Sequence, residues 1–185
     1  MKRINIIAPL SSLSERTRLY KLSIFLNKKL GYEELTHIGW ERIEGEREEK
    51  RLDFKINKKI ILKGGGYGTS KVKPLYFLWL IKSFFYALKL NKKDIVWALG
   101  FESAFPAMMA SKIIGFQVVF DDADRFSMIF NFPGPVNSLI RYLEKVTSRN
   151  VAYHVVPGKQ RYDFSSKKFF ELKNTPSQSQ LEIAK

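Results

Sequence analysis

The chain has 185 residues, of which 45% are apolar and 27% charged. This balance is typical of one globular domain with a substantial core, and it excludes a disordered chain. The absence of cysteine excludes a disulfide framework and a cysteine-based zinc site. The net charge of +14 favours an anionic partner, and composition leaves open a phosphorylated substrate, anionic lipid or nucleic acid.

Short apolar runs recur along the chain and predict buried strands. We place these strands at 4–8, 34–38, 59–62, 94–99, 116–120, 151–156 and 169–172. Apolar residues at helical spacing predict helices at 14–30, 74–90, 103–114, from 135 onward, and at 158–164. Strands that alternate with helices indicate an α/β, Rossmann-like three-layer domain with a mostly parallel sheet and helices on both faces. No run of about 18 apolar residues occurs, so no transmembrane helix is predicted.

Three carboxylates follow the strand predicted at 116–120. Asp121, Asp122 and Asp124 would crowd negative charge at one strand end, which raises the pKa of at least one of them unless a cation or hydrogen-bond donors intervene. In a parallel sheet, ligands bind outside the carboxyl ends of the strands. The aspartates are therefore candidates to orient a hydroxyl, act as a base or hold a divalent ion. The structural alternative is helix capping and ion pairs with Arg125.

The same rule selects three other loops, at 9–15, 64–70 and 100–103. Glu102 could face the same cleft as the aspartates, or it could be a first-turn acid favoured by the helix dipole. The glycine-rich loop at 64–70 would let a phosphate or sugar approach its backbone, although a mobile loop is the favoured interpretation and the Walker spacing is absent. Arg16 and Arg18 could bind a pyrophosphate bidentately or form a solvated helix face.

The two histidines carry no predicted chemistry. His37 and His154 have no cysteine, histidine or acid at metal-ligand spacing, so both are predicted to be structural and no metal site is predicted. No Ser-His-Asp arrangement follows from the sequence.

Several segments follow one another in a familiar order. Glu15-Arg16-Thr17-Arg18 opens the first predicted helix, and Gly31-Tyr32 ends it. The central strand, helix and strand contain the motifs at 94–98, 106–107 and 113–121, and Val155-Val156-Pro157 precedes the motif at 173–176. In order and spacing these motifs resemble the N-terminal domain of retaining GT-B glycosyltransferases of the large family-four type, which includes bacterial polysaccharide enzymes. The sequence has Leu10-Ser11-Ser12 where that family often carries a Gly-Gly pair.

The resemblance implies an acceptor-side domain over 1–173 and a linker over 174–185 toward a donor-binding half, without which the chain would be inactive. The implied activity moves a sugar from a nucleotide-sugar, a substrate held mainly by the donor-binding half, to a glycan acceptor that is expected to be lipid-linked. No cofactor and no catalytic metal are expected. The catalytic candidates are Asp121, Asp122 and Asp124. The acceptor-binding candidates are Ser12, Arg16, Arg18, Gly66, Glu102 and Arg125.

The helix predicted at 74–90 supports a second hypothesis. Its large apolar residues suit core packing, but Trp79 and a stripe formed by Lys82, Lys89 and Lys93 also suit an interfacial helix that contacts anionic lipid. The alternative function is a non-catalytic subunit that recruits a polysaccharide-synthesis enzyme to a membrane or binds a partner. Either function implies a cytoplasmic protein, peripheral on the inner face of the plasma membrane where it touches lipid. Nucleic acid is the least favoured partner, since no recognised binding motif occurs.

Overall fold

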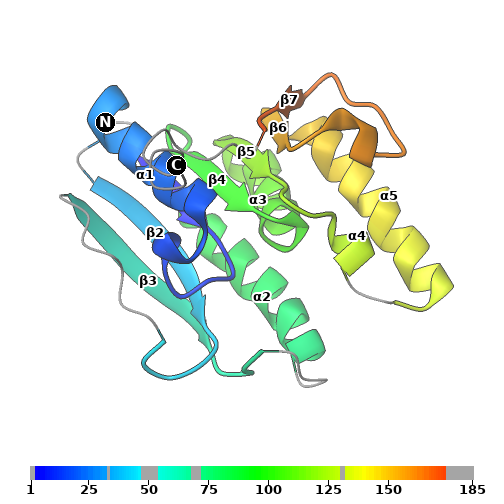
Figure 1. The fold of residues 1–185 in the computed structure, drawn as a ribbon, viewed down its shortest axis with the longest axis horizontal. Helices are drawn as coiled ribbons and strands as arrows, with labels where there is room; N and C mark the ends of the chain where they lie inside the picture. Colours follow the sequence, from blue (N-terminus) through cyan, green and yellow to red (C-terminus); the bar gives the residue numbers. More distant parts are fainter. Residues whose placement is uncertain (1–2, 33, 47–53, 68–71, 130–131, 174–185) are drawn as a thin grey trace, which may run out of the picture.

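The chain folds into a three-layer α/β domain (Figure 1). A computed structural model describes residues 3–32, 34–46, 54–67, 72–129 and 132–173. The linker expected over 174–185 lies outside the described residues, as does part of the glycine-rich loop.

Seven strands form one sheet, in the order β3-β2-β1-β4-β5-β6-β7. They are β1 (Ile4–Ile7), β2 (Glu34–Glu41), β3 (Lys55–Lys63), β4 (Ile95–Leu99), β5 (Gln117–Asp121), β6 (Tyr153–Val156) and β7 (Phe169–Glu171). Every neighbouring pair is parallel, so the predicted parallel sheet is confirmed. The two central strands, β1 and β4, pair directly, with Ile4 opposite Ile95. Because all the strands run in one direction, their carboxyl ends share one edge of the sheet.

Helices cover both faces of the sheet. They are α1 (Thr17–Leu30), α2 (Val72–Ala87), α3 (Phe101–Ile114), α4 (Phe126–Ile129) and α5 (Gly134–Asn150), with 3-10 turns η1 (Leu13–Glu15) and η2 (Lys159–Arg161). On one face, Leu19 and Leu26 of α1 pack with Ile6 in one apolar cluster. On the other face, α2, α3 and α5 pack over a second cluster that includes Trp79 and Phe120. The predicted arrangement of helices on both faces is therefore confirmed.

The turn from β4 into α3 is tighter than the sequence predicts. Gly100 has a φ of 73°, a left-handed conformation that glycine adopts without steric cost. The helix therefore begins at Phe101 rather than at Ser103, and Glu102 lies in its first turn. Pro106 falls inside the helix, where it has no N–H to donate to the Glu102 carbonyl. This geometry brings the Glu102 side chain to the carboxyl edge of the sheet.

One glycine is required by a close backbone approach at this same edge. A Cβ atom on Gly39 of β2 would lie 2.6 Å from the carbonyl oxygen of Leu10, which accepts a hydrogen bond from the Trp40 amide at 3.0 Å. We expect Gly39→Ala to lower the free energy of unfolding by about 1–3 kcal/mol, because the clash is with backbone that cannot rotate away. Urea denaturation followed by circular dichroism would measure the loss.

Gly134→Ala is the matched control for this prediction. A Cβ atom on Gly134 would meet nothing within 4 Å, and the residue lies at the start of α5. This variant should be as stable as the parent chain or slightly more stable, since alanine favours helix. Equal stability of the two variants would contradict the close approach at Gly39.

Candidate functional site

The carboxyl edge of the sheet collects polar side chains from five strand exits. They are Ser12 after β1, Arg42 after β2, Glu102 after β4, Asp121 and Asp122 at the end of β5, and Tyr162 after β6. The parallel sheet explains why residues so distant in sequence share one edge. Some of these side chains are held by hydrogen bonds and ion pairs with other protein groups. Others have hydrogen-bonding or proton-transfer capacity that no group of the described residues uses.

Asp121 contacts side chains of two neighbouring elements. Its side chain is fully buried, with one carboxylate oxygen 3.0 Å from Nη2 of Arg18 on α1. The other oxygen accepts a 2.9 Å hydrogen bond from Nε1 of Trp97 on β4. Burial raises the pKa of Asp121 to about 6, although Arg18 and Trp97 oppose the shift. The neighbouring charge of Asp122, which the sequence indicated as the cause, contributes least to this increase in pKa. The ion pair between Asp121 and Arg18 connects α1 to the sheet.

The other two aspartates point elsewhere. Asp122 is buried and accepts a 2.7 Å hydrogen bond from the Tyr162 hydroxyl, whose pKa is raised by burial and by this carboxylate. Asp124 is exposed, and its carboxylate lies 3.6 Å from Nη1 of Arg161. Within the described part of the chain, no three histidine, aspartate or glutamate side chains are placed to hold a metal ion. The aspartates therefore do not form one cluster, and their catalytic roles stay predictions.

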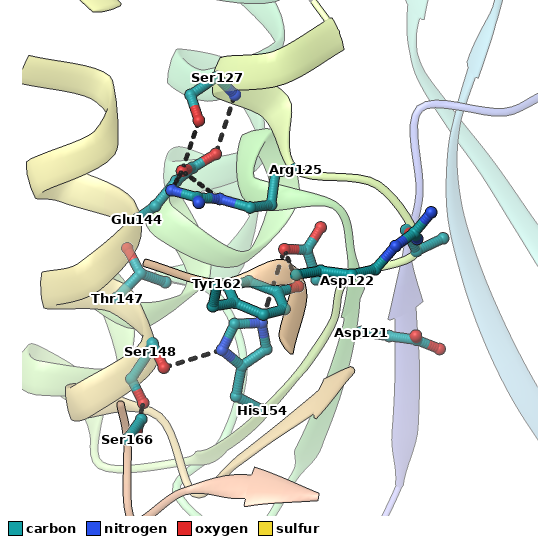
Figure 2. Close-up of polar contacts among 12 residues, drawn as sticks. Asp121, Asp122, Arg125, Ser127, Glu144, Thr147, Ser148, His154, Tyr162 and Ser166 are labelled. Carbon is teal, nitrogen blue, oxygen red and sulfur yellow. Dashed lines mark hydrogen bonds and ion pairs between the residues drawn. The ribbon is translucent and has the colours of Figure 1, made fainter. Parts of the chain in front are cut away.

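Asp122 also belongs to a buried Ser-His-Asp arrangement that the sequence did not indicate (Figure 2). Ser148 Oγ lies 2.8 Å from His154 Nδ1, and His154 Nε2 lies 3.6 Å from Asp122 Oδ2. The three residues are at most 1% exposed, so no substrate carbonyl can reach the serine. His154 also stacks on Phe120 with ring centroids 4.0 Å apart. The arrangement is part of the core, which agrees with the structural role predicted for His154.

Arg125 is the centre of a second buried network (Figure 2). Its Nη2 lies 3.1 Å from Glu144 of α5, and its Nη1 lies 2.9 Å from Asp163. Glu144 also accepts hydrogen bonds from the amide and hydroxyl of Ser127, at 2.9 and 2.8 Å. These contacts join the β5 exit to α5 and to the segment after β6. Because protein carboxylates engage its guanidinium, Arg125 serves as a structural ion pair, and acceptor binding by this residue has no support here.

Glu102 keeps its proton-transfer capacity. The side chain is partly exposed and folds back over Gly100, where a Cβ atom would lie 2.6 Å from Glu102 Oε2. Burial raises the pKa of Glu102 to about 7, Asp122 and Glu144 raise it further, and Arg42 opposes them. A carboxyl group that titrates near neutrality can both accept and donate a proton. Glu102 is therefore the candidate acid or base of this edge.

The remaining predicted acceptor contacts lie around this position. Ser12 is buried, and its hydroxyl forms a 2.7 Å hydrogen bond with the hydroxyl of Ser14. Arg16 is exposed just before α1, close enough to Tyr76 to oppose the increase that burial causes in the Tyr76 pKa. Gly66 has a φ of 61°, and its amide donates a 3.1 Å hydrogen bond to the Arg42 carbonyl. Arg16 is thus accessible to a ligand, and Gly66 has open space beside its Cα although its amide is engaged.

Arg42 is a site residue that sequence reasoning missed. It follows β2 directly and is only 7% exposed. Its Nη2 donates a 2.9 Å hydrogen bond to the Tyr76 hydroxyl, and its guanidinium carbon lies 3.9 Å from the centroid of the Trp40 ring. The available signal was position alone: an arginine at a strand exit beside a tryptophan.

The predicted membrane stripe is wrong in two respects. Trp79 is fully buried, stacks on Trp40 and donates its indole N–H to Ser103 Oγ at 3.3 Å, so it cannot contact lipid. Since α2 ends at Ala87, Lys89 and Lys93 lie beyond the helix and form no helical stripe with Lys82. Lys82 is exposed, and its ammonium donates to the Ile61 carbonyl at 2.9 Å. Among the described residues, no helix is long and apolar enough to cross a bilayer.

Comparison with known proteins adds no identification. No protein-family model matches the chain, and no curated protein matches it. The fold and the side chains at the carboxyl edge are therefore the basis on which we infer a function.

The raised pKa of Glu102 predicts how stability depends on pH. The folded state holds this proton more tightly than the unfolded state between pH 4.5, the ordinary pKa, and about 7, so this stabilisation is present below that window and lost as pH rises through it. We expect Glu102→Gln, which does not ionise, to gain stability relative to the parent chain as pH rises across the window. Urea denaturation at several pH values would measure the difference.

Asp121→Asn provides an internal comparison. The pKa of Asp121 is raised from 3.8 to about 6. The gain in stability of Asp121→Asn relative to the parent chain should therefore grow as pH rises between these two values. Differences that stay flat, or that shrink as pH rises, would contradict the burial of these carboxyl groups.

Proposed function

We propose that this domain is the acceptor-side domain of a glycosyltransferase, which moves a sugar from a nucleotide-sugar to a lipid-linked glycan. The observation that carries the proposal is Glu102, a carboxyl group that titrates near neutrality at the exit of β4. The sheet order reverses between β1 and β4, and this is the point where open α/β sheets bind ligands. The order of motifs that resembles the GT-B family supports the same function.

Glu102 has a defined role in this reaction. The bond between the donor sugar and its nucleotide diphosphate breaks, the acceptor hydroxyl forms the new glycosidic bond, and the hydroxyl proton must leave. Glu102 would orient the hydroxyl and accept that proton, while the nucleotide diphosphate departs with the bonding electron pair. A carboxylate positioned for such a transfer contributes about 10²–10⁴-fold to a rate. The nucleotide-sugar itself would be held mainly by a donor-binding domain.

Binding and transfer measurements test this role. We expect a panel of alkyl glycosides, added to the ¹⁵N-labelled chain, to shift the amide resonances of Gly100, Phe101 and Glu102, and we expect Glu102→Gln to weaken the effect. With a donor-binding domain supplied, Glu102→Gln should lower kcat about 10²-fold or more, because it removes the proton acceptor. Glu171→Gln, at an exposed position of β7, is the matched control and should leave the glycoside-induced resonance shifts and kcat unchanged.

The glycoside titration also has an outcome that opposes the proposal. Shifts confined to the amino edge of the sheet, or no shift with any glycoside at millimolar concentration, would remove the acceptor-binding role.

A membrane-recruiting subunit is the second candidate function, favoured by a different observation. Phe77, Ile81 and Phe85 lie on one stripe of α2 and are 66%, 39% and 59% exposed. Exposed aromatic and aliphatic side chains on a chain of net charge +14 suit insertion at an anionic membrane surface. The apolar contact is made by these residues rather than by Trp79.

Vesicle co-sedimentation tests the membrane candidate. The parent chain should sediment with vesicles that contain phosphatidylglycerol, and Phe77→Ser with Phe85→Ser should reduce the bound fraction several-fold, because it removes the inserting side chains. Phe25→Ser is the matched control, since Phe25 is 51% exposed on α1, which packs on the opposite face of the sheet. Equal losses in both variants, or no sedimentation at low salt, would exclude a lipid-binding role for α2.

A further inference from the structure

We propose that Arg42 anchors an anion site at the carboxyl edge, and that the site takes a phosphate-type group such as a phosphomonoester or a diphosphate. The assignment of that group to the glycan acceptor depends on the proposed function, whereas the anion site itself does not.

Burial without a counter-ion is the first argument. Arg42 is only 7% exposed, yet no carboxylate of the described residues lies within ion-pair distance of its guanidinium. The nearby carboxylate of Glu46 accepts from the Arg42 backbone amide at 3.0 Å instead. Buried charges are costly unless they are paired and hydrogen-bonded. A bound anion would supply the missing pair.

Unused hydrogen-bonding capacity is the second argument. A guanidinium has five N–H donors. Among the described residues, the guanidinium of Arg42 makes one hydrogen bond, from Nη2 to the Tyr76 hydroxyl, and its buried Nε has no partner there. The saturated Arg125 provides the contrast, since three of its nitrogens face the carboxylates of Glu144 and Asp163. Arg42 is thus as deeply buried as a structural arginine, but most of its N–H donors have no acceptor in the described part of the protein, as in an arginine that binds a ligand.

An aromatic cage holds the Arg42 guanidinium in place. Its carbon lies 3.9 Å from the Trp40 ring centroid, 5.1 Å from that of Tyr76 and 5.3 Å from that of Tyr67. Trp40 is itself fixed, because its indole N–H donates to the Gly64 carbonyl at 2.9 Å and its ring stacks on Trp79. A guanidinium held in this way loses little freedom when it binds a ligand.

The backbone beside Arg42 leaves room for an anion. Gly64 and Gly66 have φ values of 80° and 61°, and a Cβ atom on either would meet nothing within 4 Å. Glycines of this conformation let a ligand approach the main chain closely. Arg16, which like Arg42 lowers the pKa of Tyr76 against the effect of burial, offers a second positive charge. A planar guanidinium matches the oxygens of a phosphate bidentately, so the phosphate class fits these groups better than a single carboxylate does.

The position of the site connects it to the proposed chemistry. Arg42 lies within electrostatic reach of Glu102, whose pKa it lowers against the effect of burial. A phosphate held at Arg42 would therefore place the attached glycan with a hydroxyl near Glu102. This geometry suits an acceptor in which a phosphate links the glycan to its carrier.

Calorimetric titration of the full chain tests the anion site. The probes are pyrophosphate, a short-chain prenyl diphosphate-linked sugar, the same sugar as an alkyl glycoside, and UDP. We expect Arg42→Gln to weaken pyrophosphate binding about tenfold or more, because it removes charge-assisted hydrogen bonds. Arg149→Gln makes the same change of charge in the last turn of α5, on an exposed side chain, and should leave the affinity unchanged.

Two further measurements keep the test decisive if Arg42→Gln does not fold. Tyr76→Phe keeps the ring and removes the hydroxyl that orients the guanidinium, so it should weaken binding several-fold. In the parent chain, pyrophosphate should shift the ¹H–¹⁵N resonance of the Arg42 Nε. An unshifted Nε resonance, no binding of pyrophosphate, or an equal loss in Arg149→Gln would overturn the anion site.

The probes separate this proposal from the proposed function. Binding of the alkyl glycoside without any binding of pyrophosphate would leave the acceptor-side role and remove the anion site. Binding of pyrophosphate through Arg42 without any binding of glycosides would support the anion site and remove the acceptor-side role. If UDP binds through Arg42 as tightly as the prenyl diphosphate sugar does, the site serves the donor, and the assignment to the acceptor is wrong.

Discussion

The parallel pairing of β1 with both β2 and β4 is the constraint on which the rest of the structure depends. Ile4 lies opposite Leu35 on one side and Ile95 on the other, so three strand exits are fixed side by side. A shift of one residue in either register would turn the buried apolar residues of β1 toward the wrong helices. The same pairing brings Arg42 and Glu102 to one edge, although the chain between them spans a strand, a helix and a second strand.

Charge at this edge is divided between two kinds of environment. Asp121, Asp122 and Glu144 are buried, and each contacts an arginine or a tyrosine that belongs to a different element. These contacts fasten α1, α5 and the segment after β6 to the sheet, and their cost of burial is offset by hydrogen bonds and ion pairs. Within the described ranges of the chain, Glu102 and Arg42 have no partner of opposite charge at ion-pair distance. The edge thus combines buried ion pairs and hydrogen bonds, which hold the elements together, with two charged groups, Glu102 and Arg42, that can still interact with a ligand.

The sequence predicted the elements whose apolar pattern is regular, and it failed where burial is polar. Strands such as β4 and β5 are short apolar runs bounded by residues that interrupt secondary structure. Their positions and the parallel sheet could therefore be predicted from the sequence. α5 could not be interpreted in the same way, because Val136 and Leu139 are 45% and 56% exposed, while Glu144 is buried. A glutamate is buried only when a partner neutralises it, and that partner, Arg125, is distant in sequence. Arg42 was missed for the same reason, because its cage is assembled from three elements.

The Trp40 ring that forms one wall of the Arg42 cage has an optical consequence. The indole lies against the Arg42 guanidinium and also stacks on Trp79, with the two indole centroids 6.1 Å apart. The excited state of an indole responds to charge at such short range, so movement of the guanidinium would alter the intrinsic emission of the protein. The remaining tryptophan, Trp97, donates to Asp121 and packs with the α1 cluster. The molecule therefore carries a native fluorescent reporter beside the strand exits, and it needs no attached dye.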